Sequence, residues 1–284
     1  MTTNVPTLVL NNGVAIPQVG FGVFQIPRPE TVRAVLTAFE AGYRHIDTAQ
    51  MYGNEAEVGE AVAASGLPRG EVFLTTKLHN ERHGHDAALA ALDESLERMR
   101  TAYVDLYLIH WPVPDEDRYV ATWRACEALL ADGKARAIGV SNLYADQLQR
   151  LAARATIVPA VNQVEVHPHV QRAGLRAYHR AHGIATEAWS PIARGRSLGD
   201  PTIATLARKH DKSAAQIILR WQVQAGNVLL TKRATPARMR ENIALFDFAL
   251  DDEDMRTIAA LDGDPHGATD RTAEAAHRMP RWTP

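Results

Sequence analysis

Short apolar runs alternate with helical patterns along most of this chain, and this alternation constrains the fold more than any other feature. Eight runs are candidate strands, at residues 19–22, 43–46, 72–76, 104–109, 137–140, 160–166, 184–189 and 228–230. Strands that alternate with helices pair in parallel through right-handed crossovers. Because α/β barrels reach 284 residues without dividing into domains, we predict one domain, a (β/α)₈ TIM barrel over residues 1–284.

The start of the chain refines this prediction. Residues 7–10 and 14–16 are apolar and flank Asn12-Gly13, a dipeptide that tolerates positive φ, so they predict a β-hairpin before the first barrel strand. The competing architecture is an open, doubly wound sheet. That fold normally carries G-x-G-x-x-G after its first strand, whereas residues 19–24 read VGFGVF.

Polar groups that can do chemistry collect where the predicted strands end. In a parallel barrel these carboxyl ends form the rim that holds active sites. The groups are Asp47 and Tyr52 after the second strand, Lys77 after the third, His110-Trp111 after the fourth, Ser141-Asn142 after the fifth, Gln163 near the end of the sixth and Trp189-Ser190 after the seventh. Each alone has an ordinary structural interpretation, such as a surface lysine or a helix N-cap. Their joint placement predicts a functional site.

Composition excludes several classes of function. The formal net charge is −2, without the basic stripe that binds nucleic acid or an anionic membrane. No apolar run approaches the roughly 18 residues of a membrane span, and the one cysteine, Cys126, cannot form an internal disulfide. We therefore predict a cytoplasmic protein that acts on a small molecule. Because long exposed hydrophobic stripes are not evident, we expect a monomer.

Several sequence blocks resemble those of the aldo-keto reductase family, in the family's order and over nearly the whole chain. They are GYRHIDTAQMYGNE at 42–55, LTTKL at 74–78, YLIHWP at 107–112, GVSN at 139–142, VNQVEVHP at 161–168 and EAWSPIARG at 187–195. GVFQIP at 22–27 and a Trp at 189 resemble the bacterial branch that contains diketogluconate reductases. The resemblance implies a barrel closed at its bottom by the hairpin, and NADPH-dependent reduction of aldehydes or ketones.

The catalytic roles that the resemblance implies agree with the chemistry of the residues. A carbonyl that accepts hydride develops negative charge on oxygen, so it needs a proton donor and dipolar groups nearby. Tyr52 is the expected donor. The Lys77 cation is expected to lower the tyrosine pKa, and Asp47 to keep the lysine charged and oriented. His110, as a neutral donor, would orient the substrate carbonyl.

The resemblance also implies how the nicotinamide half of the cofactor is held. Three polar residues match the groups that bind the nicotinamide carboxamide, namely Ser141, Asn142 and Gln163. Trp189 matches the ring that stacks on the nicotinamide. The loop 190–195 matches the segment near the pyrophosphate, and its expected contacts are Ser190, Ile192, Arg194 and Gly195.

The adenosine end departs from the family pattern. The family block IPKS-x-x-x-x-R-x-x-EN appears as LLTKRATPARMREN, in which Thr231 and Arg233 replace the usual Pro and Ser. The matching residues are Lys232, Arg238, Glu241 and Asn242. Lys232, Arg233 and Arg238 suit a 2′-phosphate because guanidinium groups bind phosphate in a bidentate manner. We therefore predict NADPH in preference to NADH, the other interpretation being a solvated basic cluster.

The substrate pocket is expected to have apolar walls from Phe24, Trp111 and Trp189, with His110 at the reacting centre. His79 stands where relatives commonly have Trp, which predicts a more polar rim. The tail at 266–284 either folds over the pocket through Met279 and Trp282 or stays mobile.

Two other classes of function compete with a reductase. A metal-dependent hydrolase on the same fold could use the H-x-H pairs at 83–85 and 167–169, but neither pair has further ligands at strand ends. We therefore predict no metal. A catalytically idle NADP(H)-binding barrel that acts as a sensor would have no need of Asp47, Tyr52, Lys77 and His110 together.

Overall fold

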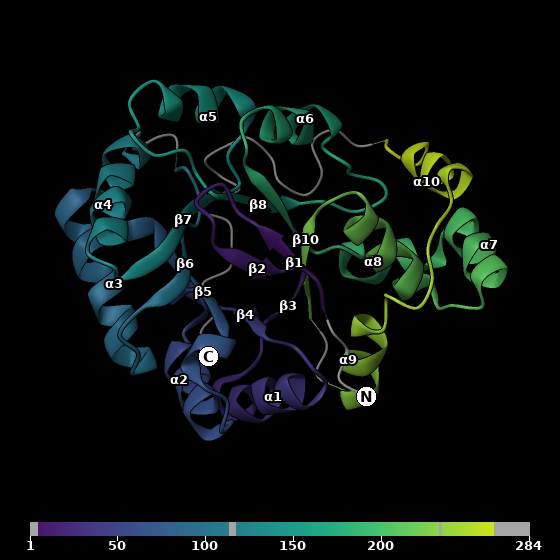
Figure 1. Cartoon of the computed structure of the whole chain (residues 1–284), viewed down its shortest axis with the longest axis horizontal. Coiled ribbons are helices and arrows are strands. Elements are labelled where there is room, and N and C mark those ends of the chain that lie inside the picture. The colour runs from purple at the N-terminus through teal and green to yellow at the C-terminus, as the bar shows by residue number, and fades with distance from the viewer. Residues whose placement is uncertain (1–4, 114–117, 233–234, 264–284) are drawn as a thin grey trace.

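Eight parallel strands close into a barrel in the order β10-β3-β4-β5-β6-β7-β8-β9. The computed structural model describes residues 5–113, 118–232 and 235–263. The barrel strands are β3 (Val19–Gly22), β4 (His45–Asp47), β5 (Phe73–Leu78), β6 (Val104–Ile109), β7 (Ala135–Ser141), β8 (Val161–Glu165), β9 (Ala185–Trp189) and β10 (Val228–Thr231). Figure 1 shows them at the centre, with helices around them. The predicted TIM barrel is confirmed.

Amphipathic helices follow the strands and bury one face against the barrel. They are α1 (Arg28–Glu40), α2 (Glu55–Ala64), α3 (His85–Met99), α4 (Tyr119–Ala131), α5 (Ala145–Ala152), α6 (Ala173–Ala181), α7 (Pro201–His210), α8 (Ala214–Gln224), α9 (Pro236–Ile243) and α10 (Asp252–Ala259). Short 3₁₀ helices are η1 (Gln50–Tyr52), η2 (Arg69–Glu71), η3 (Asn80–Arg82) and η4 (Ala193–Gly199). Helix α10 was not predicted, although Asp251 and Asp254 form a capping box at its start.

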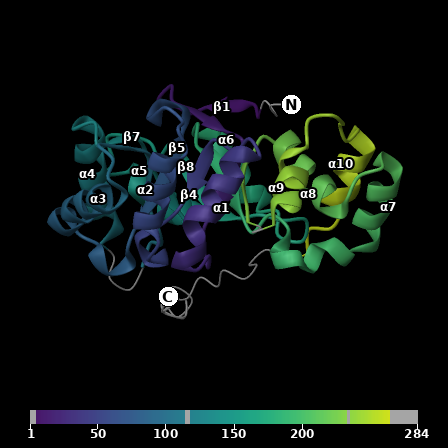
Figure 2. The same cartoon turned by 90° about the horizontal axis from the view of Figure 1, so that it is seen from below.

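The predicted hairpin is present and lies across one end of the barrel. Strands β1 (Thr7–Val9) and β2 (Ala15–Pro17) pair in antiparallel fashion, and Figure 2 shows β1 at one end of the molecule. Leu10 and Ile16 are buried in an apolar cluster with residues from the start of several strands, such as Phe73. Asn12 Nδ2 donates to the Arg136 carbonyl at 2.9 Å. The hairpin therefore covers the amino ends of the strands and leaves the carboxyl ends for the site.

Several boundaries differ from the prediction in a way that matters for the site. Asp47, Lys77 and Ser141 lie inside strands, because the parallel ladder pairs them with Thr75, Leu108 and Gln163. A strand residue is held by neighbours on both sides, so its side-chain direction is defined more strictly than in a loop.

None of the helices within the described residues has both the length and the apolar composition that crossing a membrane requires.

Candidate active site

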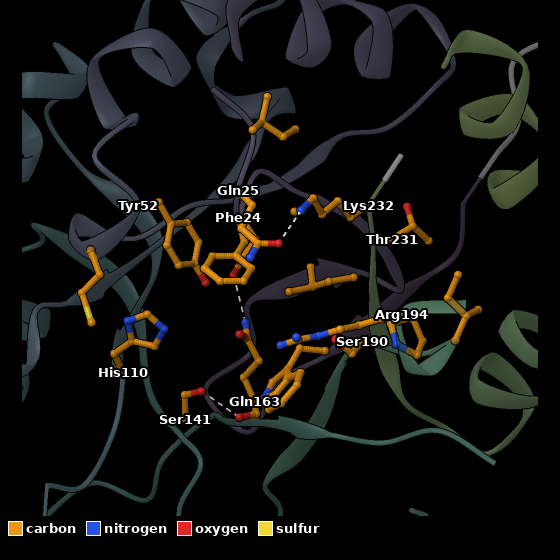
Figure 3. A pocket seen from close by; sticks show the side chains of 18 of the residues that line it. Phe24, Gln25, Tyr52, His110, Ser141, Gln163, Ser190, Arg194, Thr231 and Lys232 are labelled. Carbon is orange, nitrogen blue, oxygen red and sulfur yellow. Dashed lines mark hydrogen bonds between the residues drawn. The ribbon is translucent and has the colours of Figure 1, made fainter. Parts of the chain in front are cut away.

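A cavity of about 500 Å³ opens at the carboxyl ends of the strands. Most of the residues that sequence analysis selected line it, namely Phe24, Asp47, Tyr52, His110, Trp111, Ser141, Asn142, Gln163, Trp189, Ser190, Ile192, Arg194, Lys232 and Asn242. In Figure 3, Tyr52 and His110 lie on one side of this pocket, and Ser190, Arg194 and Thr231 lie on the opposite side. The fold thus gathers groups that are up to 218 residues apart in sequence.

A buried lysine organises the reacting side of the pocket. Lys77 Nζ donates to Asp47 Oδ1 at 2.6 Å, to the Thr48 carbonyl at 3.0 Å and to the Tyr52 hydroxyl at 3.4 Å. An ammonium has three hydrogens, so these three contacts use all of them. The Lys77 side chain is fully buried, and that of Asp47 is 3 % exposed. The Tyr52 hydroxyl is therefore next to a cation that cannot turn away without leaving a buried carboxylate unpaired.

The balance of effects on Tyr52 corrects the prediction that its pKa is lowered. Desolvation raises the pKa of Tyr52, and this effect outweighs the Lys77 charge and hydrogen bond, which lower it. The negative charge of Asp47 adds to the rise. For Lys77, desolvation alone would lower the pKa, but Asp47 and Tyr52 raise it above its usual value. Tyr52 is therefore a protonated phenol beside a firmly charged lysine.

His110 lies beside Tyr52 with the two rings in an edge-to-face arrangement, at a centroid distance of 5.6 Å. Desolvation, together with the charges of Lys77 and His79, lowers the pKa of His110 well below its usual value. A neutral imidazole keeps one N–H donor and one acceptor nitrogen. His110 can therefore donate to an oxygen in the cavity without competing with Tyr52 as an acid.

Polar side chains on the floor of the pocket are fixed by one another. Ser141 Oγ donates to the backbone carbonyl of Gln163 at 2.8 Å, and Asn142 Nδ2 donates to Ser141 Oγ at 3.0 Å. Trp189 Nε1 donates to Asn142 Oδ1 at 3.0 Å, which holds the indole ring in place. Both hydrogens of Gln163 Nε2 are used on carboxylates, Asp47 Oδ2 at 2.9 Å and Glu187 Oε2 at 2.8 Å. The amide oxygen of Gln163 is therefore left to accept from a ligand.

The loop after β9 has a strained backbone. Ser190, Ala193 and Arg194 have φ values of 50°, 50° and 56°, a region that residues other than glycine rarely adopt, and Gly195 follows at 97°. Such strain concentrates at ligand-binding segments. Ser190, Ile192 and Arg194 line the cavity, whereas Gly195 is outside its lining.

The far end of the pocket is open and cationic. Lys232 is exposed and donates from Nζ to Gln25 Oε1 at 3.1 Å, next to the cavity. Arg238 is exposed on α9 and Glu241 is half-buried, and neither lines the cavity, whereas Asn242 does. Arg233 is outside the described residues. Of the three cations predicted to bind a 2′-phosphate, the described residues include Lys232 and Arg238.

The expected apolar walls are in place, but His79 is not among the residues that line the cavity. Its Nδ1 accepts from the Glu81 backbone N–H at 3.1 Å and so caps η3. His79 instead borders a separate depression with Arg82 and Arg98. This cap explains why the structure does not support His79 as part of the substrate rim. The predicted tail closure by Met279 and Trp282 lies outside the described residues.

Sequence reasoning missed two buried groups below the pocket, His45 and Glu187. Both side chains are fully buried, and His45 Nε2 lies 3.6 Å from Glu187 Oε1. The alternation of strand side chains could have found them, because His45 precedes Asp47 by two residues and Glu187 precedes Trp189 by two. Residues at such spacing share a face, so these groups had to point into the barrel.

One histidine of the pairs considered for a metal, His169, has other partners. His169 makes hydrogen bonds to Ser197 Oγ at 3.2 Å and to Asp200 Oδ2 at 3.0 Å. Within the described part of the chain, no three His, Cys, Asp or Glu side chains gather into a metal-binding group. The metal-dependent alternative therefore has no ligand cluster among these residues.

A closed parallel barrel with a buried Lys77–Asp47 pair beside a cavity at the carboxyl ends of its strands defines an enzyme of the (β/α)₈ barrel class. The family model described as the aldo/keto reductase family matches residues 18–263, and the chain belongs to this family. The predicted family is thus confirmed, while its placement in the diketogluconate reductase branch stays a prediction.

Relatives agree with this assignment over most of their length. The chain is 48% identical to the morphine 6-dehydrogenase of Pseudomonas putida, covering 90% of this chain and 91% of the relative. It is 47% identical to the glyoxal reductase of Bacillus subtilis, covering 91% and 93%. A crystal structure of an aldo/keto reductase from Brucella melitensis has a TM-score of 0.90 at 50% identity, covering 92% and 100%. The Bombyx mori aldo-keto reductase, solved in complex with NADP, has a TM-score of 0.86 at 38% identity, covering 91% and 93%.

Proposed function

We propose that this protein reduces aldehydes or ketones to alcohols with NADPH, with Tyr52 as the proton donor. The observation that carries the proposal is the contact of the Tyr52 hydroxyl with Lys77, next to neutral His110 and inside a ligand-sized cavity. Family membership and the NADP complex of the Bombyx mori relative support the same reading.

The residues present suit the cofactor. Gln163 offers an amide oxygen, Trp189 offers an indole held by Asn142, and Lys232 and Arg238 offer cations for a phosphate. When bound, NADPH supplies the hydride. Ser141, Asn142, Gln163 and Trp189 would hold its nicotinamide, and the segment 190–195 its pyrophosphate.

The chain's own part of the reaction is to place and protonate the carbonyl oxygen. His110 donates a hydrogen bond that orients this oxygen toward Tyr52. The O–H bond of Tyr52 breaks as the proton moves to the substrate oxygen, and the Lys77 cation stabilises the phenolate that remains. Asp47 keeps Lys77 charged and aimed at that phenolate. Because its resting pKa is raised, the phenol gives up its proton only when the developing alkoxide attracts it.

The pocket suggests a class of substrate but does not select an individual substrate. Phe24, Trp111 and Trp189 form apolar walls, which favour a carbonyl with an apolar or compact body. Two relatives of nearly equal identity are a morphine 6-dehydrogenase and a glyoxal reductase, so overall similarity does not select the substrate. We further propose that the protein works in the cytoplasm as a monomer.

The test is NADPH oxidation by the wild type and Tyr52→Phe over methylglyoxal, an aromatic aldehyde and a diketo sugar acid. We expect wild-type turnover, and a kcat about 10²- to 10⁴-fold lower in Tyr52→Phe with NADPH binding unchanged. Tyr178→Phe is the control, because Tyr178 stacks on His182 away from the pocket.

Two outcomes would contradict the proposal. NADPH oxidation that requires an added divalent metal and stops with a chelator would contradict the proposed metal-free reduction. NADPH binding without turnover of any carbonyl would favour a sensor.

A further inference from the structure

Glu187 lies one layer below the pocket and is linked to it by a single side chain. On β9 it precedes Trp189 by two residues and so faces the barrel interior as Trp189 does. Its Oε2 accepts from Gln163 Nε2 at 2.8 Å, and the same nitrogen donates to Asp47 Oδ2 at 2.9 Å. One amide thus bridges two buried carboxyl groups, one of which is bound to Lys77.

The charges around Glu187 do not balance if both carboxyl groups are ionised. Lys77 has its three hydrogens on Asp47, Thr48 and Tyr52, so none is left for Glu187. His45 makes a hydrogen bond to Thr75 Oγ1, and burial lowers the pKa of His45 to about 3, so it is neutral.

The remaining strand neighbours of Glu187 add no charge. Gln163 on β8 and Val228 on β10 lie opposite it in the ladder, and neither ionises. The titratable groups that face Glu187 are therefore His45, Asp47, Lys77 and, beyond Lys77, Tyr52.

A proton on Glu187 removes the imbalance. Burial and the negative charge of Asp47 raise the pKa of Glu187 to about 8, although Gln163 and Lys77 act in the opposite direction. Its Oε1 lies 3.6 Å from His45 Nε2 and accepts no hydrogen bond among the described residues, so a negative charge on this oxygen would lack a donor. Burial and these neighbours therefore favour the neutral carboxyl group over the carboxylate.

We infer that Glu187 is a positioning residue that holds a proton beneath the pocket in the free enzyme and releases it when oxidised nicotinamide binds. The inference rests on the proposed function, because it needs Gln163 and Trp189 to contact the nicotinamide ring. That ring is positively charged when oxidised and neutral when reduced. A positive charge near the buried network favours the carboxylate, so the O–H bond of Glu187 breaks and its proton leaves to solvent.

Proton release from Glu187 makes the affinity for NADP⁺ depend on pH in a defined direction. Between about pH 6 and 8, binding of NADP⁺ is accompanied by loss of a proton, so its affinity rises with pH, whereas NADPH carries no such charge. At an effective dielectric constant near 20, a charge about 10 Å away changes an affinity roughly tenfold. We expect the ratio of the NADPH and NADP⁺ dissociation constants to change by about this factor across that range.

The first experiment detects the proton without any cofactor. Protein labelled with ¹³C at glutamate carboxyl carbons is titrated by NMR as wild type, Glu187→Gln and Glu55→Gln. Glu55 is a matched control, because it is also buried but is bonded to Thr76 and Arg98 outside the pocket. A resonance with a midpoint near pH 8 should be present in wild type and Glu55→Gln and absent in Glu187→Gln. If every glutamate of the wild type ionises below pH 6, the inference is wrong.

The second experiment measures the linkage. Dissociation constants of NADP⁺ and NADPH are determined by quenching of tryptophan fluorescence from pH 6 to 9. The ratio of the NADPH and NADP⁺ dissociation constants should change about tenfold with pH in the wild type. In Glu187→Gln this ratio should not change with pH, because glutamine keeps the acceptor for Gln163 but has no proton to lose. Glu187→Met, which also cannot ionise, should behave as Glu187→Gln does and serves if that variant does not fold. An unchanged pH dependence in these variants would overturn the inference. Failure of the wild type to bind either cofactor would contradict the proposed function and leave the NMR result standing.

Discussion

At one end of the pocket, Asp47, Lys77 and Gln163 lie inside strands and are almost fully buried. At the other end Lys232 is exposed on a loop, and Arg238, outside the cavity lining, is exposed on helix α9. The buried groups have partners on neighbouring strands, so the barrel ladder defines their directions. The two exposed cations are in contact with solvent, which competes for their hydrogen bonds. Under the proposed function, the reaction therefore depends on rigid strand ends, and phosphate binding depends on exposed side chains.

The energetic consequence is a difference in how each end responds to change. A buried ion pair that loses one partner leaves an uncompensated charge in a low-dielectric interior. An exposed ion pair is already hydrated and screened by salt, and contributes about 0–1 kcal/mol. Substitutions at the buried end should thus reduce both stability and activity, and those at the exposed end should alter binding alone.

The largest effect is expected from Lys77→Met. It leaves Asp47 buried without its cation, so the unfolding free energy should fall by about 3–5 kcal/mol, and kcat should fall at least about 10²-fold because the Tyr52 phenolate loses its charge partner. Urea unfolding and NADPH oxidation measure the two effects. Lys134→Met is the control, since Lys134 Nζ lies 2.6 Å from Asp93 Oδ1 just as Lys77 does from Asp47, but the Lys134 pair is exposed. Equal stability losses in both variants would remove the distinction between the two ends.

Acid should destabilise the protein through histidines that are buried in their neutral form. Burial lowers the pKa of His179 to about 3, against about 6.5 in an unfolded chain. Its stabilising contribution is complete above pH 6.5 and is lost as pH falls from 6.5 toward 3, by up to about 1.4 kcal/mol per pH unit. Urea unfolding at a series of pH values gives the unfolding free energy as a function of pH. This free energy should fall less steeply with acid for His179→Gln than for wild type. His182→Gln, at an exposed position, should keep the wild-type slope.

At the exposed end, Arg238→Ala should raise the KM for NADPH about tenfold and leave that for NADH and kcat nearly unchanged, because only NADPH carries the 2′-phosphate. Added salt should narrow the gap between wild type and variant. Steady-state kinetics with both cofactors at two ionic strengths is the measurement, and Arg240→Ala on the same helix is the control. A parallel rise in KM for NADH would show that Arg238 acts on the helix rather than on the phosphate.

The smallest effect is expected from Gln25→Ala. It removes an exposed hydrogen bond from Lys232, which leaves that lysine more mobile next to the cavity. Cofactor dissociation measured by stopped-flow fluorescence should change by no more than about twofold. A change of tenfold or more would mean that the contact closes the pocket in solution.

Sequence alone determined the alternation of strands and helices, the hairpin, the rim on which Asp47, Lys77, His110 and Gln163 gather, and the family. These features follow from local hydrophobic periodicity and from motifs whose order along the chain maps directly onto strand order in a barrel. Boundaries were shifted by one or two residues because the ladder, rather than the apolar run, decides which residues pair.

Tertiary structure alone decided which side chains meet across the barrel and how deeply each is buried. Periodicity places Glu187 on the inner face of its strand, but it does not show that Gln163 joins it to Asp47. Likewise, the proximity of Lys77 suggested a lowered pKa for Tyr52, and desolvation reversed the direction. His79 caps η3 outside the cavity because of the path of its own loop. Pairing across the barrel and loss of solvent are non-local, so only the folded chain determines them.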